Sequence, residues 1–380
     1  MQLLVIKTGA LGDVVRTTAI LPGLARRYAD LRVTWLTAHG ALELVRGHRL
    51  VARALGVDPQ DAAELAAVER ELARTPFERV LSFDDEEPLC RLAAALGGPP
   101  EAGRLSGAYL SAGARHYTGD VAPWFDMGLL SVHGKAEADR RKLENTRSHP
   151  RIFADMLGIE MGEPELVLPP EARAFAQRFA ARTNLHARGG RVIALNTGAG
   201  GRWESKRLSE ERTVELASAL ARALAGRATF LLCGGPEEGE RNARIGRGLA
   251  AAGLAWVDAG TRNTLLEFAA LLARCDLVVT SDSLALHLAT TQKVPILAFF
   301  APTPAHEIEL YGRGEAVAST APDYGSYRPD ADTSTLTVER LLAAALRVLG
   351  RKEEERGDAE ERRGGRGAEG EAWRSDSVSD

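Results

Sequence analysis

Short apolar segments alternate with longer helical patterns along this chain, and the alternation begins twice. In the first half, strands are expected over residues 3–7, 32–37 and 80–83, with helical patterns over 13–28 and 89–96. Such alternation is typical of β-α-β units, in which helices cover the faces of a parallel sheet. It predicts an α/β fold.

The same alternation restarts near Arg191 and predicts a second α/β unit. The strands of this unit are expected over residues 192–196, 228–233, 277–280 and 294–300, and a long helix over 210–224. Thr264 and Glu267 stand at the spacing of a capping box, in which each side chain bonds to a free backbone N–H of the first turn. A helix is therefore expected to begin there.

Length and composition divide the chain into two domains and a tail. At 380 residues the chain is too long for one ordinary core, and three prolines between 164 and 170 indicate a linker. We expect an N-terminal α/β domain over residues 1–168 and a C-terminal one over 169–350. Residues 351–380 are charged and almost free of apolar side chains, so a disordered tail is expected. The stretch 97–170 suits long loops and short helices.

The composition argues against several functional classes. Apolar residues make up 45% and charged residues 26%, as in folded soluble proteins, and a formal charge of -4 gives no reason to expect a nucleic-acid partner. The cysteines Cys90, Cys233 and Cys275 show neither a disulfide pattern nor zinc-ligand spacing. No apolar run has the length of a signal peptide or a membrane span. A cytoplasmic protein without a metal site is expected.

Three polar turns follow apolar strands and are candidate ligand sites. They run from Lys7 to Asp13, from Asn196 to Gly201 and from Ser281 to His287. A strand that ends in small polar residues and leads into a helix presents free backbone N–H groups and the positive end of the helix dipole. Such turns in both halves of the chain predict a nucleotide-type ligand held between two domains.

The side chains at these turns also have ordinary structural interpretations. An aspartate such as Asp13 suits the start of a helix, whatever its chemistry. Lys206 either neutralises a phosphate or is a solvated residue before a helix capped by Ser209. His287 is expected to face inward, either as a ligand-binding group or as a core residue. The dinucleotide fingerprint G-x-G-x-x-G is absent, so a nicotinamide cofactor is not expected.

Taken together, several motifs resemble glycosyltransferase family 9, the ADP-heptose:lipopolysaccharide heptosyltransferases. The motifs are Gly12-Asp13 with Thr17, Lys206 after a glycine-rich loop, Cys233-Gly234-Gly235-Pro236, Asp282-Ser283-x-x-x-His287, and Phe299-Phe300-Ala301-Pro302-Thr303. The resemblance extends over about residues 1 to 350. It implies a GT-B fold, in which two Rossmann-like domains face a central cleft, the C-terminal one holding the donor and the N-terminal one the acceptor.

The resemblance also implies an inverting sugar transfer in one displacement, without a bound metal or cofactor. Asp13 would be the general base that takes the proton of the acceptor hydroxyl, and Lys206 would offset charge on the departing diphosphate. The remaining residues would bind the donor: Gly12, Gly198, Gly200, Gly201, Asp282, Ser283, Leu284 and His287. ADP-heptose is the expected donor and a lipopolysaccharide core or another glycan the expected acceptor, with peripheral contact at the inner membrane.

Several alternatives stay open at this point. Leu284 stands where the family commonly has glycine and Leu208 where it often has tryptophan, so another nucleotide sugar is an alternative donor. The basic run at 140–142, with Arg147 and His149, either meets acceptor phosphates or is a solvated surface. A nucleotide-sugar epimerase of GT-B shape and a non-catalytic sugar-nucleotide-binding protein are alternative functions. A metal-dependent GT-A transferase is disfavoured, because the Asp-x-Asp triplet at 330–332 lies in a late loop.

Overall fold

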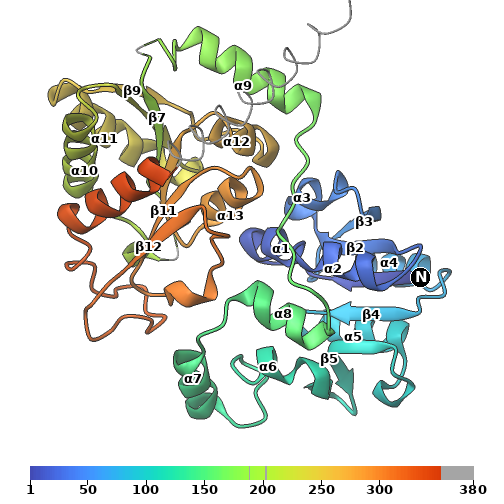
Figure 1. The fold of residues 1–380 in the computed structure, drawn as a ribbon. Coiled ribbons are helices and arrows are strands. Elements are labelled where there is room, and N and C mark those ends of the chain that lie inside the picture. Colours follow the sequence, from blue (N-terminus) through green and yellow to red (C-terminus); the bar gives the residue numbers. More distant parts are fainter. Residues whose placement is uncertain (188, 202, 352–380) are drawn as a thin grey trace, which may run out of the picture.

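The protein folds into two domains that lie side by side, each built on its own six-stranded sheet (Figure 1). The computed structural model describes residues 1–187, 189–201 and 203–351. The tail expected over 351–380 lies outside the described residues from position 352 onward. Within the described ranges, no helix is both long and apolar enough to cross a membrane.

The first sheet has the strand order β3-β2-β1-β4-β5-β6 and is parallel except for the antiparallel pair β5 and β6. Its strands are β1 (Gln2–Ile6), β2 (Arg32–Ala38), β3 (Val51–Val57), β4 (Arg79–Ser82), β5 (Leu105–Ser111) and β6 (Ala114–Tyr117). Along β1, Leu3 and Val5 belong to one apolar core, whereas Leu4 and Ile6 belong to another. Both faces of the sheet are therefore buried, which explains why the strand is apolar throughout.

Helices of the first domain flank this sheet and extend from its lower end in Figure 1. They are α1 (Leu11–Thr17), α2 (Ile20–Arg27), α3 (Leu42–Arg46), α4 (Ala62–Leu72), α5 (Glu87–Gly97), α6 (Ala122–Phe125), α7 (Lys135–Glu144) and α8 (His149–Leu157). Both α5 and α8 carry proline in the first turn, where its missing N–H costs no hydrogen bond.

The second sheet is parallel throughout, with the order β12-β11-β10-β7-β8-β9. Its strands are β7 (Arg191–Asn196), β8 (Ala228–Cys233), β9 (Ala255–Asp258), β10 (Leu277–Ser281), β11 (Ile296–Phe300) and β12 (Gly314–Ala318). The helices of this domain are α9 (Pro170–Arg182), α10 (Glu210–Ala223), α11 (Gly239–Ala251), α12 (Leu265–Leu272), α13 (Leu284–Thr291) and a last helix that includes residues 338–351.

Both sheets have the strand order of a Rossmann domain, 3-2-1-4-5-6 when each is counted from its own first strand. The order reverses between β1 and β4 in the first sheet and between β7 and β10 in the second. Ligands of such sheets bind outside the carboxyl ends of the strands at this reversal. The topology therefore points to the turns after β1, β4, β7 and β10 as the places for a site.

One apolar core continues from the first domain into the second. It includes Val14 and Val15 of α1 together with Leu286 and Ala289 of α13. Burial of this kind between domains favours a fixed relative placement, because separating them would expose apolar surface to water. The two helices that follow β1 and β10 are thereby packed against each other.

The structure confirms the strands expected in the second half and the capping box of Thr264 and Glu267. The helix expected over 13–28 is instead two helices, α1 and α2. Pro22 gives the reason, since it has no N–H with which to continue a single helix across Thr18. The expectation of loops and short helices over 97–170 is wrong where β5 and β6 form.

Gly107 of β5 shows why that strand was missed, because a glycine within a strand weakens the sequence pattern. It pairs with Ser82 of β4 and has φ +135°, and a Cβ at this position would clash with the Ser82 carbonyl. The backbone of β4 approaches too closely to admit any side chain.

We therefore expect Gly107→Ala to destabilise the fold by at least about 2 kcal/mol, through strain and displacement of β4. The midpoint of urea unfolding measures this. Gly119→Ala is the matched control, since no atom lies within 4 Å of a Cβ there. Equal midpoints for the two variants would contradict the close approach of the strands.

Candidate active site at the domain interface

The turn after β1 in the first domain and the turn after β10 in the second domain meet where α1 packs on α13. Gly12 of α1 lies against His287 of α13, and a Cβ on Gly12 would be 2.5 Å from the imidazole Cδ2. The glycine therefore admits the histidine ring from the other domain. This contact brings the turn after β1 and the turn after β10 into one interdomain site.

Asp13 lies in the first turn of α1 and is about one-third exposed (36%). It does not cap the helix, because the cap position belongs to Ala10. Its carboxylate instead forms an ion pair of 2.9 Å with Arg16, one turn along. Burial raises the pKa of Asp13, but the positive charges of Arg16 and Lys7 oppose it, and that pKa lies below its usual range. The carboxylate is thus ionised and able to accept a proton.

Arg16 is a site residue that the sequence analysis missed. Its guanidinium carbon lies 5.8 Å from the ring centroid of Trp124, and its Nε is buried without a hydrogen-bond partner among the described residues. The signal in the sequence was spacing, since residues three apart on a helix are neighbours. The arginine faces the same interdomain region as Asp13.

A buried ion pair links the turns after β1 and β4, between which the strand order of the first sheet reverses. The Lys7 ammonium pairs with one oxygen of Asp84, and the other oxygen accepts hydrogen bonds from the Thr8 backbone N–H and hydroxyl. All three residues are buried. The pair ties the end of β1 to the end of β4 and so fixes the turn that leads to Asp13. Asp84 was not anticipated, because it follows a four-residue strand with no glycine-rich motif.

Lys206 and Asp282 form the central ion pair of the second domain. The ammonium donates to the Asp282 carboxylate at 2.7 Å and to its backbone carbonyl at 3.0 Å. Burial raises the pKa of Asp282, but the Lys206 ammonium opposes this and brings it down to about 2. The pair joins the loop after β7 to the turn after β10, which is the reversal point of the second sheet.

His287 faces inward, as expected, and lies beside Asp282. Its Nε2 is 3.9 Å from Asp282, and the side chain is buried. Burial lowers the pKa of His287 to about 4, with the Arg16 charge acting in the same direction. The imidazole is therefore neutral near pH 7 and can donate one hydrogen bond and accept another.

The start of α13 is held by side chains of neighbouring strands. Ser283 precedes the helix, Leu284 begins it, and the Ser283 hydroxyl lies 2.9 Å from that of Thr280 and 3.2 Å from the Asn196 amide nitrogen. The serine side chain does not bond to the helix backbone, so the first turn of α13 has no side-chain cap at this end. That arrangement suits an anion.

The glycines of the loop after β7 are explained in part by their own neighbours. A Cβ on Gly198 would clash with the Glu238 carboxylate, and one on Gly201 would lie 2.7 Å from Glu237. Gly200 has φ +75°, a conformation that favours glycine. Gly198 and Gly200 thus have reasons within the fold of the loop, whichever ligand it meets, whereas the exposed Glu237 side chain could move aside from a Cβ on Gly201.

Of the basic residues at 140–142, only one reaches the other domain. Arg140 and Arg141 pair with Glu137 on their own helix, which agrees with a solvated surface. The Lys142 ammonium instead lies 3.5 Å from the ring centroid of Tyr327, whose hydroxyl donates to Glu307. Burial lowers the pKa of Lys142. This contact crosses the domain interface next to Asp13.

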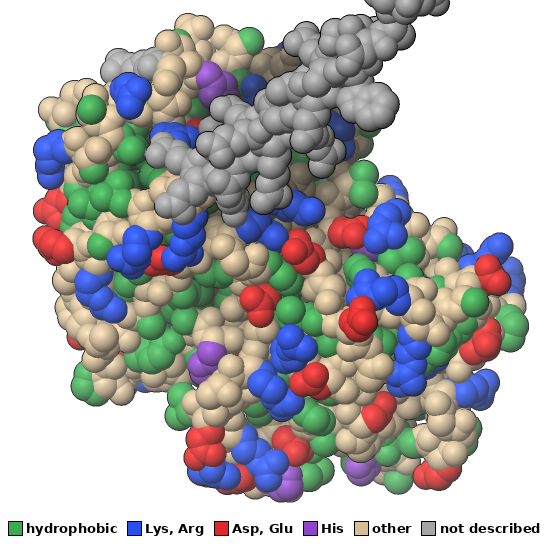
Figure 2. Space-filling view, in the orientation of Figure 1, with side chains coloured by type: hydrophobic (Ala, Val, Ile, Leu, Met, Phe, Trp, Pro, Cys, Tyr) green, Lys and Arg blue, Asp and Glu red, His purple; other side chains and the backbone are tan. Residues whose placement is uncertain are grey.

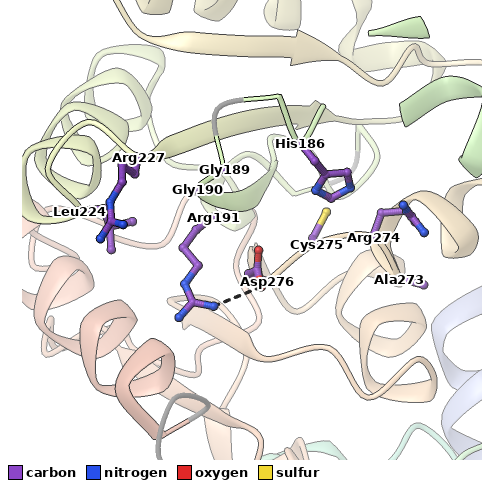
Figure 3. Close-up of a pocket in the computed structure, with 10 residues that line it drawn as sticks. All are labelled: His186, Gly189, Gly190, Arg191, Leu224, Arg227, Ala273, Arg274, Cys275 and Asp276. Atoms are coloured by element: carbon purple, nitrogen blue, oxygen red, sulfur yellow. Dashed lines mark hydrogen bonds and ion pairs between the residues drawn. The ribbon is translucent and has the colours of Figure 1, made fainter. Parts of the chain in front are cut away.

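A separate pocket of about 640 Å³ lies at the opposite edge of the second sheet (Figure 3). Its lining comes from residues just before β7, β8 and β10 and from Arg191, the first residue of β7, which pairs with Asp276 at 3.4 Å. It is therefore at the amino ends of the strands, away from both reversal points. Among residues 1–187, 189–201 and 203–351, no group of His, Cys, Asp and Glu side chains is arranged to hold a metal ion.

The Lys206–Asp282 pair should make the stability of the fold depend on pH. A carboxyl whose pKa is about 2 in the fold and about 3.8 otherwise stabilises the fold above pH 4, and this stabilisation is lost as the pH falls toward 2. We expect the free energy of unfolding lost in Asp282→Asn to be largest at pH 6 and to shrink by roughly 1 kcal/mol at pH 3. Urea titrations of both proteins at the two pH values measure it, and a pH-independent difference would contradict the pairing.

Comparisons with known proteins agree with this geometry. The family model of glycosyltransferase family 9 (heptosyltransferase) matches residues 117–328, which is more than half of the chain. No curated protein sequence matches. The fold is similar to that of a family 9 glycosyltransferase from Veillonella parvula, at 19% identity, with 92% of this chain and 97% of the other covered and a TM-score of 0.70.

Two Escherichia coli enzymes are also similar in structure. ADP-heptose lps heptosyltransferase II is 17% identical over 93% of this chain and 100% of its own, with a TM-score of 0.64. Heptosyltransferase WaaC, solved with ADP-2-deoxy-2-fluoro heptose, is 21% identical over 94% of this chain and 100% of its own, with a TM-score of 0.54. At these identities the likeness shows the fold, which is GT-B as the resemblance implied. Because the family model covers most of the second domain and part of the first, the chain belongs to glycosyltransferase family 9, the heptosyltransferase family.

Proposed function

We propose that this glycosyltransferase transfers heptose from ADP-heptose to a lipopolysaccharide core or a similar glycan, with inversion and in one displacement. The observation that carries the proposal is the α1–α13 contact, which brings Asp13 near His287 and the Lys206–Asp282 pair. A proton acceptor on one domain thereby faces a phosphate-type site on the other.

In the proposed reaction the acceptor hydroxyl oxygen attacks the anomeric carbon of the donor sugar. The bond from that carbon to the diphosphate oxygen breaks, ADP leaves, and the hydroxyl proton passes to Asp13. The ion pair with Arg16 keeps Asp13 ionised before the step, and its partial exposure leaves room for an acceptor. A carboxylate with a lowered pKa is a weak base. The proton transfer would therefore depend on how closely the acceptor hydroxyl is held between Asp13 and the donor sugar, and not on the basicity of Asp13 alone.

Donor binding is assigned to the turn after β10 and the loop after β7. A lysine ammonium has three N–H donors, and Asp282 takes two of those of Lys206, which leaves one for a diphosphate oxygen. The first-turn amides at Ser283 and Leu284 and the neutral imidazole of His287 would supply further donors. The ADP moiety and the heptose enter the proposal because structural relatives are ADP-heptose enzymes.

The acceptor side is assigned to the first domain, around Trp124 and α7. Lys142 and Arg16 provide positive charge there beside Asp13. A lipid-linked core acceptor would bring the enzyme to the cytoplasmic face of the inner membrane as a peripheral protein. An epimerase or a non-catalytic binder would need no acceptor, and the chain's place in a transferase family does not favour either one.

Replacement of the base tests the proposal. We expect Asp13→Asn to lower kcat for heptose transfer to a heptose-deficient lipopolysaccharide core by at least about 100-fold, while ADP binding by calorimetry stays within a factor of about three. Asp155→Asn, an exposed carboxylate on α8 of the same domain, should leave both unchanged.

Three results are informative. Loss of transfer with retained ADP binding supports the role of Asp13. Full transfer by Asp13→Asn would contradict that role. An absence of transfer by the wild type, despite tight ADP binding, would contradict the proposed sugar and acceptor.

A further inference from the structure

Large apolar side chains are left in solvent at one place in the first domain. The three most exposed among the described residues are Leu129 at 88%, Val132 at 74% and Leu143 at 55%. All three lie within fifteen residues, in the loop between α6 and α7 and on α7 itself. Single exposed apolar residues are common, but a concentration of the most exposed ones marks an interaction surface.

We infer that this segment, residues 128–143, is a docking surface for an anionic lipid bilayer. It is named here the docking loop, with Leu129 and Val132 at its tip. Membrane binding by this segment is argued from its exposed side chains and charge. Only the statement that a lipid-linked acceptor would reach the site from this side rests on the proposed function.

The docking loop is anchored at its base, although its tip is exposed. The Tyr117 hydroxyl donates to Asp126 at 2.5 Å and accepts the backbone N–H of Val132 at 3.2 Å. Arg141 of α7 pairs with the other oxygen of Asp126 at 2.9 Å. The Tyr117 and Asp126 network therefore holds the backbone at Val132 and the helix at Arg141, while the side chains of Leu129 and Val132 stay in solvent.

Charge complementarity identifies a lipid surface as the occupant. The docking loop contains four Lys and Arg but two Asp and Glu, and residues 144–151 after it add two Arg and one Glu, whereas the whole chain has a formal charge of -4. Apolar tips flanked by positive charge bind the headgroup region of anionic membranes, where the side chains enter the apolar boundary and the cations meet lipid phosphates. The segment thus has a net positive charge on a chain whose net charge is negative, which an anionic bilayer would attract and a partner of neutral surface would not.

The position of the docking loop fits the rest of the molecule. In Figure 1, α6 and α7 lie at one end of the first domain, beside loops of the second domain and away from α9 and α12. Side chains of both charges cover this lower lobe in Figure 2. The same α7 carries Lys142 to Tyr327 across the interface. A bilayer at the tip would therefore be close to the acceptor side of the site.

Vesicle binding by the full-length chain tests the inference without any nucleotide sugar. The probe is vesicles of phosphatidylethanolamine with phosphatidylglycerol, and pure phosphatidylcholine vesicles serve as the uncharged comparison. We expect the wild type to sediment with the anionic vesicles, and to do so less at high salt. The double variant Leu129→Ser/Val132→Ser should bind at least about tenfold more weakly.

Leu346→Ser is the matched control, since Leu346 is another exposed apolar residue (36%), on the helix of residues 338–351. It should bind vesicles like the wild type. Both sets of side chains are exposed, so the thermal midpoint should be unchanged in every variant, which separates docking from folding.

Three outcomes would overturn the inference: no binding of the wild type to anionic vesicles, equal binding by the double variant, or a wild-type dimer in sedimentation velocity that the double variant abolishes. The last would assign the tip to a second copy of this chain. Vesicle binding that depends on the tip supports the inference even if heptose transfer fails, so the two proposals fail separately.

Discussion

The close packing of α1 on α13 is the constraint on which the site depends. Each helix follows a strand at the reversal point of its own sheet, so the contact places two ligand-binding edges opposite each other. Gly12 allows this approach, because any side chain would meet the imidazole of His287. Without the contact, Asp13 and Asp282 would lie on separate Rossmann domains, and neither domain alone would hold both of the groups to which the proposed function assigns a role.

The electrostatics of the site follow from that packing. Two carboxylates from different domains lie near each other, and each keeps a lowered pKa only because a cation accompanies it, Arg16 for Asp13 and Lys206 for Asp282. The same cations and burial keep His287 neutral. A like-charged pair of acids without these partners would share a proton, which would remove the base. In the proposed reaction, this ion pairing would leave Asp13 ionised to take the proton of an acceptor hydroxyl.

The fold was predictable to the extent that its signals are local. The β-α-β alternation, the Ser209 cap and the inward face of His287 follow from short-range sequence patterns, and the structure confirms them. Contacts between residues distant in sequence were not predictable. No pattern near Asp84 indicates that it pairs with Lys7, and the place of Arg16 in the site is evident only from its contact with Trp124 and its position beside the second domain. A single sequence does not encode which turns meet across a domain interface. Strand β5 was missed for a local reason, its central Gly107.

The most direct test of this account is a crystal structure of the protein with ADP. The account predicts that the diphosphate lies within hydrogen-bond distance of the Lys206 ammonium and of the first-turn amides of α13, facing Asp13. A nucleotide bound elsewhere would contradict it, for example in the pocket near Arg227 and Arg274 at the amino ends of the second sheet.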